Sequence, residues 1–139
     1  MPSVADWHGE DGVRMTGDAA RVVVDGDDSP YGYQFSSPVV RVGKGDRIEL
    51  DVPNVVRQGR VCVGVLNGDG SRWLVLADQW RERMRFDTDK TLGFRVVFAN
   101  CRDRVPNGKS LFEVSAASFV SRTQWYADQM VERVYGSRR

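Results

Sequence analysis

The chain has 139 residues, with 20 basic and 19 acidic side chains and a net charge of +1. This length matches one domain that buries its own core without help from metals or disulfides. The balanced charge provides no overall field to attract nucleic acid or an anionic membrane surface, and no apolar run approaches the roughly 18 residues of a membrane span. We therefore predict one soluble domain that binds neither nucleic acid nor membrane.

Residues 1–20 are rich in Gly and Asp and predict an irregular lead-in or edge strand, with Trp7 requiring a place to dock. From Arg21 to Phe119 about eight short segments alternate between apolar and polar residues and are separated by turn residues, which predicts an antiparallel β-sandwich. Pro38 demands an edge position, a bulge or a break. The expected strands cover 21–25, 33–42, 47–52, 60–66, 72–77, 80–87, 92–101 and 111–119.

In the last segment, the spacing of apolar residues changes from alternation to a helical period. Ser121 and Gln124 form a capping-box pattern, and apolar residues then recur at helical spacing as far as Val134. This pattern predicts one amphipathic α-helix over residues 121–136. A helix of this length is marginal alone in water, so we expect it to pack on the sandwich, on a second copy in a homodimer, or on a neighbouring domain.

Cys62 and Cys101 lie in separate apolar segments, without the spacing of metal ligands. We expect each to act as a small buried hydrophobe, because a disulfide would require their strands to be neighbours. The first residues carry neither a charged nor an apolar targeting segment. The sequence therefore predicts a cytoplasmic protein without a metal site or cofactor.

Catalytic patterns are weak. The only histidine, His8, falls in the lead-in segment, which disfavours a hydrolytic triad. The Asp-rich run 25–28 fails as an EF-hand loop, because Pro30 and Ser36 stand where that loop needs Gly and Glu. Glu82 interrupts an apolar row and indicates either a partnered inward carboxylate or a wet groove. We predict that the protein is not an enzyme.

Two patterns leave alternatives open. Arg81, Arg83 and Arg85 form a stripe that would either bind an anionic polymer or keep an outer strand soluble. In the expected hairpin around residues 67–70, Trp73 lies opposite Val65 and enters the core, or lies opposite Leu66 on the other face. A slip of one residue decides between these two positions.

The runs 31–52 and 59–74 resemble jelly-roll domains of the carbohydrate-binding-module type, which often accompany bacterial glycosyltransferases and glycan-processing proteins. The similarity spans roughly residues 20–119 and consists of a strand-and-turn rhythm with a few anchored motifs: Tyr-Gln before Ser-Pro, Gly-x-x-Ile-x-Leu, Val-Gly-Val-Leu, and Phe-x-Val-x-Phe-Ala-Asn. The resemblance implies a noncatalytic module that binds glycan on a sheet face or at the rim loops.

We therefore predict an all-β jelly roll of about eight strands with one C-terminal α-helix, acting as an accessory module that binds a glycan or a glycan-bearing polymer. Aromatic stacking and hydrogen bonds from Arg, Asn or Gln would recognise the sugar. The predicted contacts are Trp73, Trp80, Tyr31, Tyr33, Arg95 and Asn100. The alternative is a protein-interaction or oligomerisation module of a larger bacterial protein, in which a partner covers the second-face residues Cys62, Leu66, Val97 and Ala99.

Overall fold

The computed structural model describes residues 1–101 and 108–121, which fold as antiparallel β-sheet after one 3-10 turn, η1 (Val4–Asp6). The all-β prediction is confirmed for these residues, whereas the helix predicted over 121–136 falls beyond Ser121, outside the described part of the chain. The strands are β1 (His8–Gly9), β2 (Arg14–Gly17), β3 (Arg21–Asp25), β4 (Tyr33–Ser36), β5 (Val40–Arg41), β6 (Arg47–Asp51), β7 (Asn54–Gln58), β8 (Val61–Asn67), β9 (Trp73–Val75), β10 (Arg83–Asp87), β11 (Gly93–Asn100), β12 (Leu111–Ser115) and β13 (Ser118–Ser121).

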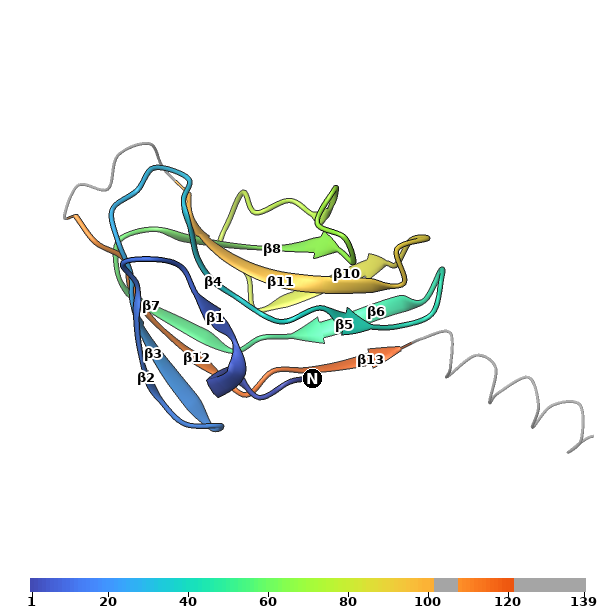
Figure 1. Ribbon diagram of the computed structural model, residues 1–139, viewed down its shortest axis with the longest axis horizontal. Helices are drawn as coiled ribbons and strands as arrows, with labels where there is room; N and C mark the ends of the chain where they lie inside the picture. Colours follow the sequence, from blue (N-terminus) through green and yellow to red (C-terminus); the bar gives the residue numbers. More distant parts are fainter. Residues whose placement is uncertain (102–107, 122–139) are drawn as a thin grey trace, which may run out of the picture.

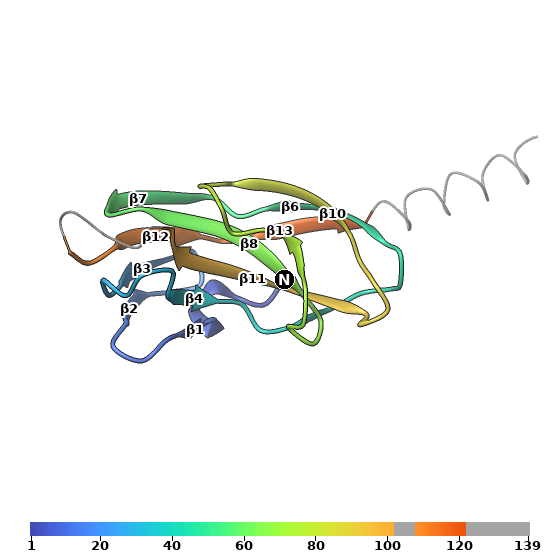
Figure 2. The ribbon, with the colours of Figure 1, turned by 90° about the horizontal axis from the view of Figure 1, so that it is seen from above.

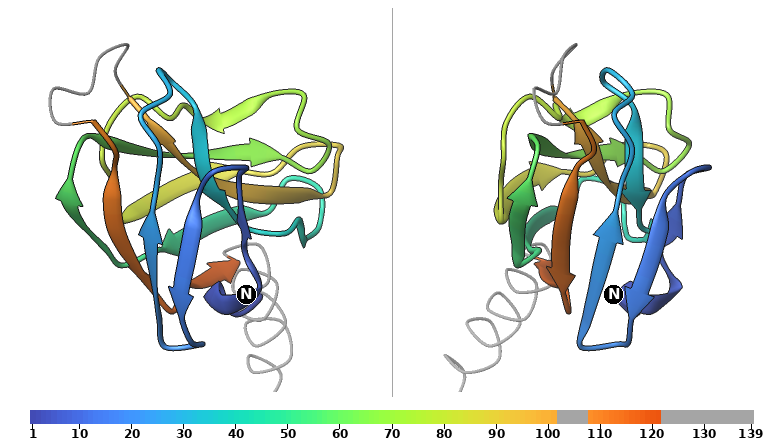
Figure 3. Two further views of the ribbon diagram at one scale, coloured as in Figure 1. Left: turned by 60° about the vertical axis from the view of Figure 1, so that its left-hand side comes forward. Right: turned by 90° about the vertical axis from the view of Figure 1, so that its left-hand side faces the viewer.

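The strands form three sheets in two layers. Sheet A has the order β1-β4-β11-β8-β9, with β5 also pairing β11; sheet B is β2-β3-β12-β7, and sheet C is β10-β6-β13. Sheets B and C adjoin along the chain, because β6 leads into β7 and β12 leads into β13. Together they form the layer that faces sheet A, as seen in Figure 1 and from two further sides in Figure 3.

Side chains from both layers meet in one hydrophobic core. Alternation is reflected in burial: Ile48 and Leu50 of β6, and Met84 and Phe86 of β10, are all buried. Trp80 and Glu82, which continue the second row before β10, are not buried. Full burial of such side chains contributes about 1.5–3 kcal/mol each to stability. From β11 the core receives Phe94, Val96 and Phe98.

The predicted strand over 33–42 is interrupted. It forms β4 and β5, with residues 37–39 between them, which is the break that Pro38 allowed. The Ser37 hydroxyl replaces part of the lost ladder by accepting a hydrogen bond from the Val96 N–H at 2.9 Å. The last predicted strand is likewise divided into β12 and β13, and β7 was not predicted.

The first residues contribute edges to both layers: β1 pairs β4 in sheet A, and β2 pairs β3 in sheet B. The expectation that Trp7 docks is confirmed. Its ring is 2% exposed, lies 5.4 Å from Phe35 between ring centroids, and its indole N–H donates to the Pro2 carbonyl at 3.2 Å. Among the described residues, no helix is long and apolar enough to cross a membrane.

Candidate functional site

Sheet A turns a second apolar surface away from the core. Register pairs Val97 of β11 with Gly64 of β8, and Ala99 with Cys62, so these side chains share the outer face. Figure 2 looks from above onto the layer in which β4, β11 and β8 lie side by side. Leu66, Val97 and Ala99 form a cluster there, and each is at most 5% exposed. Side chains on this face must therefore cover the cluster.

An aromatic pair, Tyr33 and Trp73, lies on this face. Trp73 packs against the cluster, and its ring meets the Tyr33 ring edge-to-face, with centroids 6.0 Å apart and planes at 78°. Tyr33 belongs to β4 and Trp73 to β9, with β11 and β8 between them. Strands spaced about 4.8 Å apart place the two backbones roughly 14 Å apart. Both side chains therefore extend inward across the sheet.

The register of the β8–β9 hairpin places Trp73 on this face. Leu66 pairs with Trp73, so of the two alternatives the structure adopts the one that keeps Trp73 out of the core. Asn67, which is buried, fixes the turn: its N–H donates to the Arg72 carbonyl at 2.9 Å, and its side-chain oxygen accepts from the Arg72 N–H at 3.2 Å.

A carboxylate from the next turn anchors the same hairpin. The Asn67 amide donates to Asp89 Oδ2 at 3.0 Å, and Asp89 also accepts hydrogen bonds from the hydroxyl and N–H of Thr91. The Thr91 side chain, then Asn67, then the Thr91 backbone lower the pKa of Asp89 to about 2. The Thr91 hydroxyl oxygen in turn accepts from the Gly68 N–H at 2.7 Å. The turn that presents Trp73 is thus held at both ends.

Arg95 occupies the same face and pairs across β11 and β8 with Leu66, which pairs with Trp73. Its Nε is enclosed and has no hydrogen-bond acceptor. Within residues 1–101 and 108–121, no carboxylate forms an ion pair with Arg95. Three of the predicted contacts, Tyr33, Trp73 and Arg95, therefore share one face.

Asn100, the last residue of β11, binds a neighbouring loop, and Tyr31 belongs to that loop. Asn100 continues the core-facing row of Phe94, Val96 and Phe98 and is 1% exposed, so its side chain does not lie on the outer face with Tyr33 and Trp73. Its amide donates to the carbonyls of Asp27 and Ser29 at 3.1 and 2.9 Å, which fixes the loop between β3 and β4. Tyr31 sits at the tip of that loop with a φ of 54° and is 64% exposed.

The same loop contains a compact polar network around Asp27. Gln34, which is fully buried, donates to Asp27 Oδ1 at 2.8 Å and accepts from the Asp27 N–H at 2.7 Å. Burial raises the pKa of the Asp27 carboxyl, but the hydrogen bonds from Ser29 and Gln34 outweigh it, and the net pKa is lowered. The network holds the base of the strand that presents Tyr33.

Trp80 lies in a separate groove of about 390 Å³, whose lining includes Val56, Val61 and both cysteines. The ring is 50% exposed, and its N–H donates to Asn54 Oδ1 at 2.7 Å, which fixes its orientation. The groove adjoins the outer face of sheet A at Cys62, but neither Tyr33 nor Trp73 lines it.

Cys62 and Cys101 are disulfide-bonded, with their Cα atoms 5.3 Å apart. The interpretation of two separate thiols is wrong for this structure, because β8 and β11 are neighbours and Ala99 pairs with Cys62. Disulfides persist chiefly in oxidising compartments. The cytoplasmic location stays a prediction.

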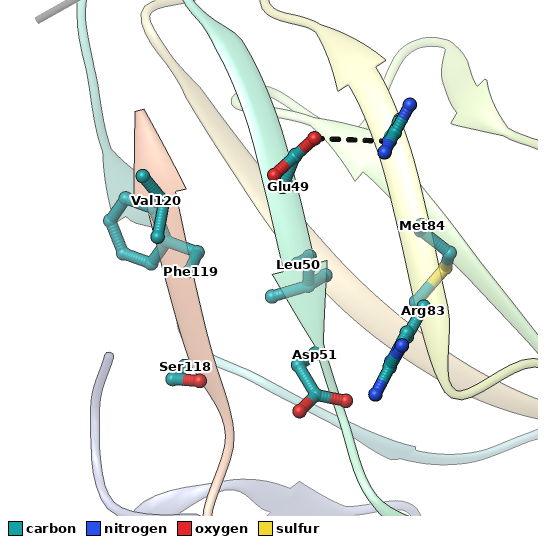
Figure 4. A pocket seen from close by; sticks show the side chains of 9 residues that line it. Glu49, Leu50, Asp51, Arg83, Met84, Ser118, Phe119 and Val120 are labelled. Atoms are coloured by element: carbon teal, nitrogen blue, oxygen red, sulfur yellow. Dashed lines mark ion pairs between the residues drawn. The ribbon is translucent and has the colours of Figure 1, made fainter. Parts of the chain in front are cut away.

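The outer faces of sheets B and C carry paired charges instead of rings. Glu113 bridges Arg57 at 2.9 Å and Arg21 at 3.5 Å, and Glu49 pairs with Arg85 at 3.0 Å. Figure 4 shows the shallow pocket of about 560 Å³ on sheet C, with Arg83, Asp51 and the Glu49–Arg85 pair along its lining.

The predicted arginine stripe is shorter than expected. Arg83 and Arg85 lie exposed on β10, whereas Arg81 precedes the strand, pairs with Asp78 at 2.9 Å and donates to the Leu76 carbonyl. Glu82 accepts a long hydrogen bond, 3.5 Å, from the Asn54 N–H, so it has a partner.

A catalytic constellation does not emerge from the described part of the chain. His8 is exposed, and its Nε2 lies 4.0 Å from Glu10. Residues 1–101 and 108–121 contain no group of three or more His, Cys, Asp or Glu side chains that could hold a metal ion. The arrangement on sheet A is suited to binding a ligand, because flat apolar rings lie beside a cation.

No protein-family model matches the chain, and no curated protein matches it. Among solved structures, the chain is similar to the second N-terminal cellulose-binding domain of the β-1,4-glucanase C from Cellulomonas fimi. The identity is 18%, the match covers 86% of this chain and 88% of that chain, and the TM-score is 0.44. The function therefore rests on this chain's own residues.

Proposed function

We propose that the protein is a noncatalytic carbohydrate-binding module and that its outer face of sheet A binds the glycan. The observation that carries this proposal is the Tyr33–Trp73 ring pair, part-exposed above a buried apolar cluster. The proposal includes a jelly-roll connection of the strands, because the chain alternates between the layers: β3, β4, β6 and β8 belong in turn to sheets B, A, C and A.

The chemistry of a sugar ring fits such a surface. One face of a pyranose presents C–H groups and is apolar, while its edge carries hydroxyls that need hydrogen-bond partners. Rigid aromatic rings provide flat apolar area at a small entropy cost, and polar groups beside them fix the orientation. Here Trp73 and Tyr33 provide the rings, and Arg95 provides donors within the same face.

The Trp73 and Tyr33 rings are held in place by their neighbours, which supports a role in binding a glycan. Trp73 follows a turn fixed by Asn67 and Asp89, and Tyr33 precedes Gln34, which is fully buried and bound to Asp27. A surface that is ordered before binding loses less conformational entropy when it binds. The extended sheet face also suits a linear polymer better than an enclosed pocket would.

The alternative is an interaction module, and one of its premises is weakened. The sequence suggested that Leu66, Val97 and Ala99 need a partner to cover them, yet all three are buried in the isolated chain with Trp73 packed against them. Several large apolar side chains are nevertheless exposed elsewhere, including Val55, Leu76 and Val120. Light scattering distinguishes the two functions: a stable dimer without glycan affinity would favour the alternative.

Affinity electrophoresis in gels containing soluble polysaccharides, followed by tryptophan-fluorescence titration with oligosaccharides, tests the proposal. Removing Trp73 contact of roughly 50–100 Å² at about 25 cal/mol per Å² costs about 1.3–2.5 kcal/mol, which is a loss of affinity of about tenfold or more. We expect this loss for Trp73→Leu, which keeps an apolar cover on the cluster, and for Tyr33→Ala.

Trp80→Ala is the matched control, since it removes an exposed tryptophan from a groove that neither Tyr33 nor Trp73 lines. We expect that variant to retain the affinity of the wild type. Thermal melts establish that each variant is folded. Absence of binding to every polymer would reject the function, while binding that is lost only with Trp80 would reject the proposed face.

A further inference from the structure

We infer that the glycan bound at the Tyr33–Trp73 face is acidic, and that Arg95 binds the carboxylate of a hexuronic acid residue. This inference rests on the proposed function and adds the substrate class. It comes from the position of Arg95, from its missing counter-ion, and from the geometry of a carboxylated sugar ring.

Arg95 lies in the same row of the sheet as Trp73. Arg95, Leu66 and Trp73 form one row across β11, β8 and β9, so the backbones of Arg95 and Trp73 are about 10 Å apart. The guanidinium reaches toward the β8–β9 turn, where its Nη2 lies 3.9 Å from the place that a Cβ on Gly70 would occupy. The cation therefore stands at the rim of the aromatic surface.

Arg95 differs from several arginines of the opposite layer that have carboxylate partners. On the opposite layer, Arg21 and Arg57 share Glu113, and Arg85 pairs with Glu49. Arg95 forms no ion pair within the described part of the chain, and its enclosed Nε lacks an acceptor. A buried N–H without an acceptor is energetically costly, and no carboxylate of the described residues neutralises this guanidinium, so a ligand that brings an acidic group would stabilise it.

The acids of the neighbouring turns already have other donors. Asp69 accepts from the Ser71 N–H at 2.9 Å, and Asp89 is bound by Asn67 and Thr91. Hydrogen bonds from Ser71 lower the pKa of Asp69, and those from Thr91 and Asn67 lower that of Asp89. Each carboxylate is thus fixed within its own turn, and neither forms an ion pair with Arg95.

The shape of a hexuronic acid fits a ring surface with a cation at its rim. The carboxylate of a hexuronic acid projects from C5 along the edge of the ring, so the ring can stack on Trp73 while the carboxylate extends sideways. A planar guanidinium binds a carboxylate through two parallel hydrogen bonds. A ring surface with a single unpaired arginine at its rim matches this combination of an apolar face and one lateral charge.

The experiment compares acidic polymers with their neutral counterparts. Polygalacturonate, alginate and hyaluronan are each tested beside the carboxyl-reduced form of the same polymer, which keeps the linkage and removes the charge. Because charge-assisted hydrogen bonds contribute about 1.5–3 kcal/mol, we expect at least one acidic polymer to bind about tenfold tighter or more than its reduced form. Added salt should weaken this preference.

Variants then locate the effect. Arg95→Gln should bring the acidic polymer down to the affinity of its reduced form, and Arg95→Lys, which keeps the charge and loses the fork, should retain part of the preference. Arg83→Gln is the matched control, because Arg83 likewise forms no ion pair within the described residues but is exposed and lies on sheet C. Melting temperatures check that the variants are folded.

The outcomes separate the two proposals. Binding that depends on Trp73 but is equal for acidic and reduced polymers overturns the acidic ligand and leaves the carbohydrate-binding function standing. An acid preference that Arg83→Gln reduces as much as Arg95→Gln is a general charge effect and also overturns the inference. No binding to any of the six polymers, combined with no binding to neutral glycans, overturns both.

Discussion

Reduction of the Cys62–Cys101 bond should destabilise the fold without abolishing it. The two residues are 39 positions apart in the chain. In the chain-entropy description, a cross-link that closes a loop of this length stabilises the folded state by about 4 kcal/mol, and the range observed for native disulfides is about 2–5 kcal/mol. A typical domain has only about 5–15 kcal/mol of stability, so the change is large.

The assay is urea unfolding followed by tryptophan fluorescence, with and without a thiol-free phosphine reductant. Under two-state conditions we expect the reduced protein to lose about 2–4 kcal/mol of unfolding free energy. The double variant Cys62→Ala/Cys101→Ala should show the lower stability and no response to the reductant. Counting thiols with a chromogenic disulfide reagent establishes the redox state of each sample.

Two results would refute the reasoning. Two titratable thiols in protein that has been exposed to air and unfolded would mean that the sulfurs do not pair as the β8–β11 register requires. An unchanged unfolding midpoint after complete reduction would mean that the cross-link does not restrict the unfolded chain.

Three further predictions concern the elements that hold the site. Because the pKa of Asp89 is lowered to about 2, its hydrogen bonds stabilise the fold above about pH 4 and are lost as pH falls toward 2. The difference in melting temperature between wild type and Asp89→Ala should therefore become smaller over that range. A constant difference would contradict this. Gly64→Ala would place a Cβ 2.6 Å from the Val75 carbonyl and 2.8 Å from the Ala77 Cβ, so calorimetry should show a destabilisation of about 1–3 kcal/mol, and an unchanged melting temperature would mean that the 75–77 segment moves freely. Asn100→Ala removes donors from two carbonyls of the 27–29 loop; we expect a loss of about 2 kcal/mol in urea unfolding, and full stability would show that water replaces the amide.

Alternation predicted the layers well because each strand buries one face. The rows of Ile48 with Leu50 and of Phe94 with Val96 read directly as inward-facing, and all four side chains are buried. The strand β7 was missed because its side chains do not alternate between buried and exposed: after Asn54, the residues of β7 are exposed or half-buried. Period-2 patterns are informative only where one face meets the core.

Only part of the candidate site could be predicted from the sequence. Sequence reasoning selected Tyr33, Trp73 and Arg95 as separate candidates, and sheet A brings all three to one face. It also selected Asn100, whose buried amide serves the loop instead of the surface. A side chain at the end of an apolar row looks the same in sequence whether it reaches water or a backbone carbonyl.

The sequence by itself determined that this chain forms antiparallel strands around one core, because alternation and turn residues are local properties that each segment carries alone. Only the tertiary structure decided which strands are neighbours. The contact of Tyr33 with Trp73 across two intervening strands and the bond between Cys62 and Cys101 both depend on the order β4-β11-β8-β9. That order results from pairing between segments far apart in the chain, where a shift of a single residue would turn Trp73 from the surface into the core.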